Sequence, residues 1–143
     1  FYILGKATRS KLIPTISRLA AIKSAKQNSD NLEADCSRAI NKITQPPLLI
    51  AVTSKKTKED AFREKEDYAA TVCALHNMVL SLWENGVGSQ WSTGSITRDA
   101  ETYEILSIDS NTEEIIGFVK AGYPVKIREV RKKPVVDIVN YLD

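Results

Sequence analysis

A helical pattern spans residues 64–84, and its apolar side chains are spread around most of the helix circumference. These side chains are Ala69, Val72, Cys73, Ala74, Leu75, Val79, Leu80, Leu82 and Trp83. A helix that is apolar on nearly all sides has to be buried on nearly all sides. A chain of only 143 residues buries a limited fraction of its surface alone. The pattern therefore predicts a homodimer, in which a second copy of the chain covers one face of this helix.

Short apolar runs predict three strands. Residues 48–53 are apolar and partly β-branched, as in a central strand that is buried on both faces of a sheet. Residues 115–123 alternate and are rich in β-branched side chains, and residues 1–4 form a strand that Gly5 closes. We expect these strands and the helices between them to form one domain over residues 1–143.

Three more helices follow from apolar side chains at helical spacing. Residues 9–26 form the longest of them, with Thr8 as the N-cap. Pro14 then lies in the first turns, where its missing N–H does least harm. Residues 32–41 and 99–106 predict two shorter helices.

Two segments show no clear period. Residues 54–63 are charged and predict a surface loop or lid. Residues 125–143 predict an extended tail with a last helical turn at residues 135–141.

Composition excludes several classes of function. The chain has 20 Lys and Arg against 18 Asp and Glu, so its net charge of +2 gives no reason to expect a nucleic-acid partner or an anionic membrane surface. Cys36 and Cys73 stand apart from each other and from any His cluster, so we expect no metal site and no disulfide framework. No apolar run approaches the ~18–20 residues that cross a bilayer. These features predict a soluble protein of the reducing cytoplasm, with no membrane partner.

Residues 86–94 read Gly-Val-Gly-Ser-Gln-Trp-Ser-Thr-Gly. The three glycines let the backbone approach a ligand or adopt positive φ, and the hydroxyls of Ser89, Ser92 and Thr93 can donate to phosphate or ribityl oxygens. Taken without its flanks, the stretch is more simply a turn with a half-buried Trp91. With its flanks, we expect it to be a loop that cradles a ligand.

The order of the segments resembles the nitroreductase family of FMN enzymes. The matching pieces are a helix over residues 67–84, the stretch 86–94, a short helix, and residues 113–124, Glu-Glu-Ile-Ile-Gly-Phe-Val-Lys-Ala-Gly-Tyr-Pro. The resemblance implies an α+β nitroreductase-like fold, with a central mixed sheet flanked by helices and two flavins at the interface of a dimer. It covers only the later part of the family's domain, because the chain starts at Phe1 without the N-terminal helical segment that carries further flavin ligands.

The resemblance also implies cofactor contacts. It places FMN against Trp91, Ser92 and Thr93, with Gly94 allowing close approach. Many relatives carry an Arg where Ser92 stands, so a charged contact has to come from elsewhere. The tail offers Arg131 and Lys133 for the dianionic phosphate, although a basic run is about as often a solvated face.

The implied activity is an FMN-dependent oxidoreductase that takes hydride from NAD(P)H and reduces a nitro, quinone or related acceptor in a ping-pong cycle. The flavin carries the chemistry, so no catalytic side chain is expected. We assign His76 no catalytic role, and Ser92 has no Ser-His-Asp context that would indicate a hydrolase. The alternatives are a flavin-binding or degenerate relative without turnover, and a dimeric interaction module.

Overall fold

A computed structural model describes residues 1–127, 129 and 132–142. The strands are β1 (Tyr2–Ile3), β2 (Leu48–Lys55), β3 (Gly88–Ser92) and β4 (Glu113–Gly122). The α-helices are α1 (Lys6–Lys11), α2 (Ile13–Lys26), α3 (Leu32–Thr44), α4 (Ala61–Glu84) and α5 (Ala100–Leu106), and short 3₁₀ turns span Ser95–Arg98 and Val135–Asp137. The predicted α+β class is confirmed.

The strands form one sheet in the order β1-β2-β4-β3. All three pairings between the described strands are antiparallel, so the prediction of a mixed sheet was wrong. The physical reason lies in the strand order: β2 and β3 run in the same direction, but β4 lies between them and is antiparallel to both, so no two parallel strands are neighbours. The pairing of β2 with β4 shifts register between Val52 and Thr53, which face Gly117 and Ile115. Ile116 is therefore an extra residue, and β4 carries a bulge there.

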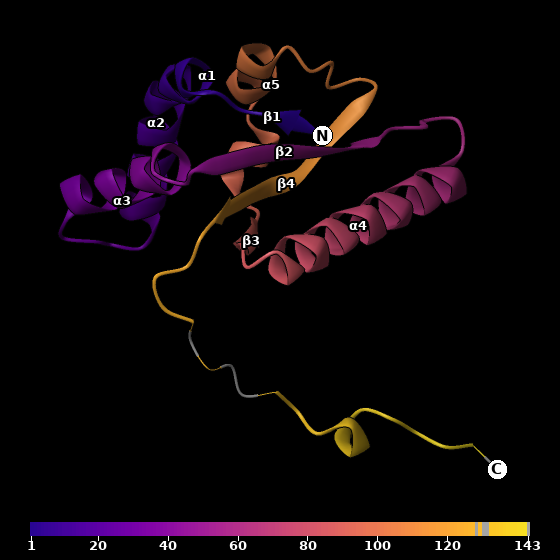
Figure 1. Cartoon of the computed structure of the whole chain (residues 1–143). Helices are drawn as coiled ribbons and strands as arrows, with labels where there is room; N and C mark the ends of the chain where they lie inside the picture. The colour runs from indigo at the N-terminus through magenta and orange to yellow at the C-terminus, as the bar shows by residue number, and fades with distance from the viewer. Residues whose placement is uncertain (128, 130–131, 143) are drawn as a thin grey trace.

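Helices cover both faces of the sheet (Figure 1). One face carries Leu49, Ala51, Ile115 and Phe118, which pack with buried residues of α2, α3 and α5. The opposite face carries Ile50, Val52, Ile116 and Val119, which pack with Leu75 of α4. Strand β2 is thus a central strand buried on both faces, as its apolar run predicts.

The first helical segment is divided. The chain forms α1 and α2, which meet at Leu12, in place of one helix over residues 9–26. Thr8 lies inside α1, whose N-cap is Gly5, so the prediction that Thr8 is the cap was wrong. Pro14 explains the division, because it has no N–H and its ring clashes with the carbonyl of Ser10, four residues earlier. Pro14 does lie in the first turn of α2, as predicted.

The charged loop before α4 is shorter than predicted. Strand β2 continues to Lys55, and α4 begins at Ala61, so only residues 56–60 connect them. Asp60 is the N-cap of α4, and its carboxylate accepts hydrogen bonds of 3.0 Å from the N–H groups of Phe62 and Arg63. A carboxylate at this position also interacts favourably with the positive end of the helix dipole, which fixes the start of α4 here.

Helix α4 is not enclosed within one chain. Leu75 is its one fully buried residue, whereas Phe62 is 72% exposed and Leu80 and Trp83 are each 53% exposed. Within the single chain, only the face of the helix that meets the sheet is covered, and burial of the other faces depends on the predicted partner. The homodimer that would cover the remaining apolar side chains stays a prediction.

The C-terminal tail leaves the body of the molecule after β4 (Figure 1). Its described residues from Val125 onward are exposed and largely extended. The predicted tail is confirmed, and its last turn is shorter than predicted, over Val135–Asp137.

Candidate functional site

The stretch 86–94 is mostly a strand. Residues Gly88–Ser92 form β3 at the edge of the sheet, so the prediction of a loop through the whole stretch was wrong. Gly86 ends α4 at φ +74°, with its N–H donating to the carbonyl of Trp83 and the N–H of Val87 donating to that of Leu82, each at 2.9 Å. This is the glycine-based helix ending that satisfies the last carbonyls of α4. Only Thr93 and Gly94 remain as the turn after the strand.

Alternation along β3 separates two sets of side chains. Gln90 and Ser92 pair with Lys120 and Phe118 of β4, and paired residues of an antiparallel ladder lie on the same face. That face is the one covered by α2 and α3, because it includes Phe118. Trp91 therefore lies on the opposite face, which packs against α4.

The indole of Trp91 supports the sheet. Its Nε1–H donates to the carbonyl oxygen of Ile116 at 3.3 Å, which gives the bulged residue of β4 a partner. A Cβ on Gly117 would lie only 2.6 Å from Cδ1 of Trp91, so glycine is what lets the indole lie against the bulge. The side chain of Trp91 does not line the cavity described next, and its predicted contact with a flavin stays a prediction.

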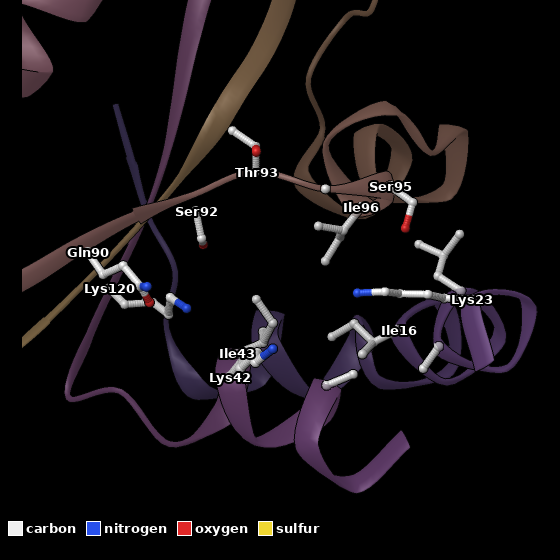
Figure 2. A pocket seen from close by; sticks show the side chains of 14 residues that line it. Ile16, Lys23, Lys42, Ile43, Gln90, Ser92, Thr93, Ser95, Ile96 and Lys120 are labelled. Atoms are coloured by element: carbon white, nitrogen blue, oxygen red, sulfur yellow. The ribbon is translucent and has the colours of Figure 1, made fainter. Parts of the chain in front are cut away.

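An open cavity of about 280 Å³ lies between the helices and the end of β3 (Figure 2). Its walls come from α2, α3, β3, β4 and the segment that joins β3 to α5. The lining residues are Ile16, Leu19, Ala20, Lys23, Ala39, Lys42, Ile43, Gln90, Ser92, Thr93, Gly94, Ser95, Ile96 and Lys120. Three of the predicted cofactor contacts, Ser92, Thr93 and Gly94, are thus brought together at one cavity.

The cavity combines an apolar helix wall with polar groups from the turn. Ile16 and Ile43 are buried in the core and give the α2 and α3 side of the cavity its apolar surface. Opposite them, Ser92, Thr93 and Ser95 contribute hydroxyls. The Ser92 hydroxyl donates to the carbonyl oxygen of Phe118 at 3.3 Å, and its lone pairs can still accept. This surface suits a flat apolar ligand with polar edges.

Gly94 leaves its part of the wall open. Its φ is +153°, and no atom lies within 4 Å of the position a Cβ would take. A ligand can therefore reach the backbone at this turn, as the glycine in the motif predicts.

Three lysines give the cavity its charge, and sequence reasoning missed all three. Lys23 comes from α2, Lys42 from α3 and Lys120 from β4. Among the described residues, none of the three forms an ion pair, and no Asp or Glu lines the cavity. Partial burial, followed by the charge of Lys42, holds the pKa of Lys120 below its usual value. The cavity is therefore positively charged and has no internal counter-charge.

Of these three lysines, only Lys120 could have been recognised from the sequence as a candidate site residue. It interrupts the apolar run of β4 at a position that points to the covered face, between Leu49 of β2 and Gln90 of β3. A charged side chain at such a position is rare unless it has a polar partner. Lys23 and Lys42 lie on exposed stretches of helix, where a lysine is ordinary.

The remaining predicted positions lie elsewhere. Arg131 lies outside the described residues, and Lys133 is exposed in the tail. His76 is exposed on α4, away from the cavity. Among the residues that the structure describes, no three His, Cys, Asp or Glu side chains gather as a metal site, and no helix has the length and apolar character needed to cross a membrane.

The sequence model of the nitroreductase family matches residues 1–123. The chain belongs to the nitroreductase family. Within this family, it is 27% identical over 132 residues to the Bacillus subtilis (strain 168) protein named "Putative NAD(P)H nitroreductase YfhC". That match covers 92% of this chain and 65% of YfhC, so the nitroreductase chain described here spans less than two thirds of that relative's length.

Solved structures show the nitroreductase fold independently. A nitroreductase-like family protein from Bacillus cereus matches with a TM-score of 0.71 at 22% identity, over 99% of this chain and 70% of that protein. A BluB-like flavoprotein from Clostridium difficile 630 matches with a TM-score of 0.67 at 19% identity, over 99% and 78% of the two chains. Oxidized iodotyrosine deiodinase, solved with FMN and 3-iodo-L-tyrosine, matches with a TM-score of 0.68 at 20% identity, over 99% and 74%. The predicted nitroreductase-like fold is confirmed.

Proposed function

We propose that this chain is part of an FMN-dependent oxidoreductase that takes hydride from NAD(P)H and reduces a nitro, quinone or related acceptor in a ping-pong cycle. Family membership supports the class of reaction. The single observation that carries the cofactor assignment is the cavity, which gathers Ser92, Thr93 and Gly94 beside uncompensated lysines.

The residues present fit a flavin. The apolar helix wall suits the isoalloxazine ring, and the open backbone at Gly94 allows the ring to come close. Ser92 and Thr93 suit the polar edge of the ring or the ribityl hydroxyls. Lys42 and Lys120 suit carbonyl oxygens of the ring, since an ammonium donates hydrogen bonds and attracts negative charge.

FMN supplies the two-electron chemistry when it is bound, and the chain supplies binding, orientation and electrostatics. In this proposal Ser92 and Thr93 orient the ring by hydrogen bonds, and the apolar side chains keep water from one of its faces. Lys42 and Lys120 favour added negative charge on the ligand at the sheet wall. Trp91 contributes by holding β3 in register against the bulge of β4.

We further propose that the tail holds the FMN phosphate through Arg131 and Lys133, and that the protein is a homodimer in which the tail of one chain reaches its partner. The extended course of the described tail residues supports the second part (Figure 1). A cytoplasmic location fits the two free cysteines, Cys36 and Cys73.

The first test is spectroscopic. We expect the purified full-length protein to be yellow, to release FMN and not FAD on denaturation, and to lose its yellow colour when NAD(P)H is added without oxygen. A colourless protein that takes up no flavin on reconstitution would refute the cofactor assignment. A yellow protein that NAD(P)H does not bleach would instead support the non-catalytic flavin-binding alternative.

The tail prediction concerns one charge. Replacing Lys133 by Ala should weaken FMN binding by ~1.5 kcal/mol, the low end of the range for a hydrogen bond to a charged group, because an ammonium makes a point contact. Riboflavin, which has no phosphate, should lose far less, and the FMN affinity should become less dependent on salt. Titration of the flavin-free protein with each ligand by flavin fluorescence gives both affinities. Equal losses for FMN and riboflavin would show that Lys133 acts through packing.

A further inference from the structure

The three lysines of the cavity do not form one group. Figure 2 shows Lys120 beside Gln90 at the sheet wall, with Lys42 on the α3 wall, whereas the side chain of Lys23 extends from α2 toward Ser95 and Ile96. Consistent with this separation, the pKa of Lys120 is lowered first by partial burial and then by the charge of Lys42, and Lys23 is not among the causes. The cavity therefore offers positive charge at two places.

The surroundings of Lys23 differ from those of Lys42 and Lys120. Its neighbours in the lining are mostly apolar, with Ile16, Leu19 and Ala20 on α2, and with Ile96 and the hydroxyl of Ser95 across the cavity. No carboxylate lines this end of the cavity among the described residues, so the ammonium has no internal counter-charge. A ligand that satisfies both features has an apolar or aromatic body and an anionic group.

We propose that this end of the cavity binds the electron acceptor, that the acceptor is an aromatic or apolar anion such as a carboxylate, and that Lys23 recognises its charge. This proposal rests on the proposed function, in which the flavin occupies the part of the cavity nearer Ser92 and Lys120. The reaction with a nitroaromatic acid then balances as ArNO₂ + NAD(P)H + H⁺ → ArNO + NAD(P)⁺ + H₂O. Lys23 stays protonated throughout and acts only on binding.

The decisive comparison uses 4-nitrobenzoate and its uncharged counterpart 4-nitrobenzamide with the full-length flavin-loaded protein. Lys23→Met keeps most of the side-chain volume and removes the charge. We expect it to lower kcat/KM for 4-nitrobenzoate relative to 4-nitrobenzamide by about three- to fivefold, the size of one partly exposed ion pair. The different intrinsic reactivities of the two compounds cancel when this ratio is compared between variants.

Lys26→Met is the matched control. Lys26 lies three residues further along α2, is exposed and does not line the cavity. The Lys26→Met substitution therefore removes the same charge from the same helix without changing the cavity lining. We expect its ratio of kcat/KM values to equal that of the unchanged protein. Benzoate and benzamide, which are not reduced, give a second readout through their perturbation of the flavin absorbance. Lys23→Met should weaken only benzoate.

Several results would overturn the proposal. An unchanged ratio would do so, as would an equal loss for both acceptors together with weaker FMN binding, because Lys23 would then contact the flavin. Slower anaerobic flavin reduction by NAD(P)H, with an unchanged acceptor ratio, would assign Lys23 to the dinucleotide phosphates. If the unchanged protein holds no flavin, the proposed function itself fails. Calorimetric titration of that flavin-free protein with benzoate and benzamide then tests Lys23 directly, and equal affinities would refute its role.

Discussion

Replacing Arg9 by Met should destabilise the protein by about 3 kcal/mol or more. The guanidinium of Arg9 is buried on α1 and donates to three backbone carbonyls: Nε to Leu4 at 2.7 Å, Nη1 to Pro46 at 2.5 Å and Nη2 to Pro47 at 3.5 Å. A hydrogen bond to a charged donor is worth ~1.5–3 kcal/mol, and the loss of the bond to Leu4 also leaves the carbonyl of a buried residue without this partner. Met keeps the apolar stem and removes all the donors.

The position of these carbonyls explains the size of the effect. Leu4 follows β1, while Pro46 and Pro47 lead into β2, so Arg9 ties the start of the chain to the start of the central strand. Lysine cannot replace this arrangement fully, because a single ammonium lacks the planar fork that reaches several acceptors. We therefore expect Arg9→Lys to fall between the unchanged protein and Arg9→Met.

Urea unfolding at a fixed protein concentration measures these differences. Arg38→Met is the control, since Arg38 is exposed on α3 and its one ion pair among the described residues is with Asp35. Exposed pairs of this kind contribute ~0–1 kcal/mol. An Arg9→Met variant as stable as Arg38→Met would contradict this prediction. It would show that the three carbonyls find other hydrogen-bond partners and that Arg9 contributes little to stability.

The second large effect concerns self-association. Replacing Trp83 by Glu should raise the dimer dissociation constant by several orders of magnitude. Trp83 and Leu80 line an exposed groove with Val79 of α4 and with Pro124 and Ile127 at the start of the tail. Burying one large apolar side chain contributes ~1.5–3 kcal/mol, and a twofold-symmetric dimer buries two copies. A loss of ~3–6 kcal/mol corresponds to roughly 10²–10⁴-fold in the dissociation constant.

Light scattering or sedimentation over a dilution series tests this prediction. Ser37→Glu on α3 is the control, because it adds the same charge at an exposed position on the opposite side of the sheet. We expect the unchanged protein and Ser37→Glu to remain dimeric at micromolar concentration and Trp83→Glu to be monomeric. A folded, unchanged protein that is monomeric at that concentration would contradict the homodimer outright.

The elements that sequence reasoning predicted well are those whose pattern is local. β2 begins at Leu48 directly after Pro46 and Pro47, and α3 begins at Leu32, both as predicted. The break between α1 and α2 was not predicted, because the apolar spacing continues across Leu12, although Pro14 was visible in the sequence. Strand β3 was predicted as a loop, because its glycines and hydroxyl side chains favour a turn. Pairing with β4 overrides that local preference.

The site shows the same limit more sharply. Ser92, Thr93 and Gly94 are consecutive, so a motif could find them, and they do meet at one cavity. Lys23 and Lys120 are far apart in sequence and line the same cavity only because α2 packs over the face of the sheet that β4 presents. The periodicity of a single segment cannot predict which distant segments line the same cavity. The basic run that was visible, around Lys133, lies instead in the tail.

The cavity has two walls that are held in place by different means. Gln90 and Lys120 belong to strands whose spacing is fixed by a continuous ladder of backbone hydrogen bonds. Lys23 and Lys42 belong to helices that rest on that sheet through side-chain packing. A substitution at an exposed helix position can thus change the charge or width of the cavity while the ladder stays intact. We therefore expect changes in acceptor specificity, in nature or by directed evolution, to arise mainly from substitutions in α2 and α3, because these disturb the stability of the sheet least.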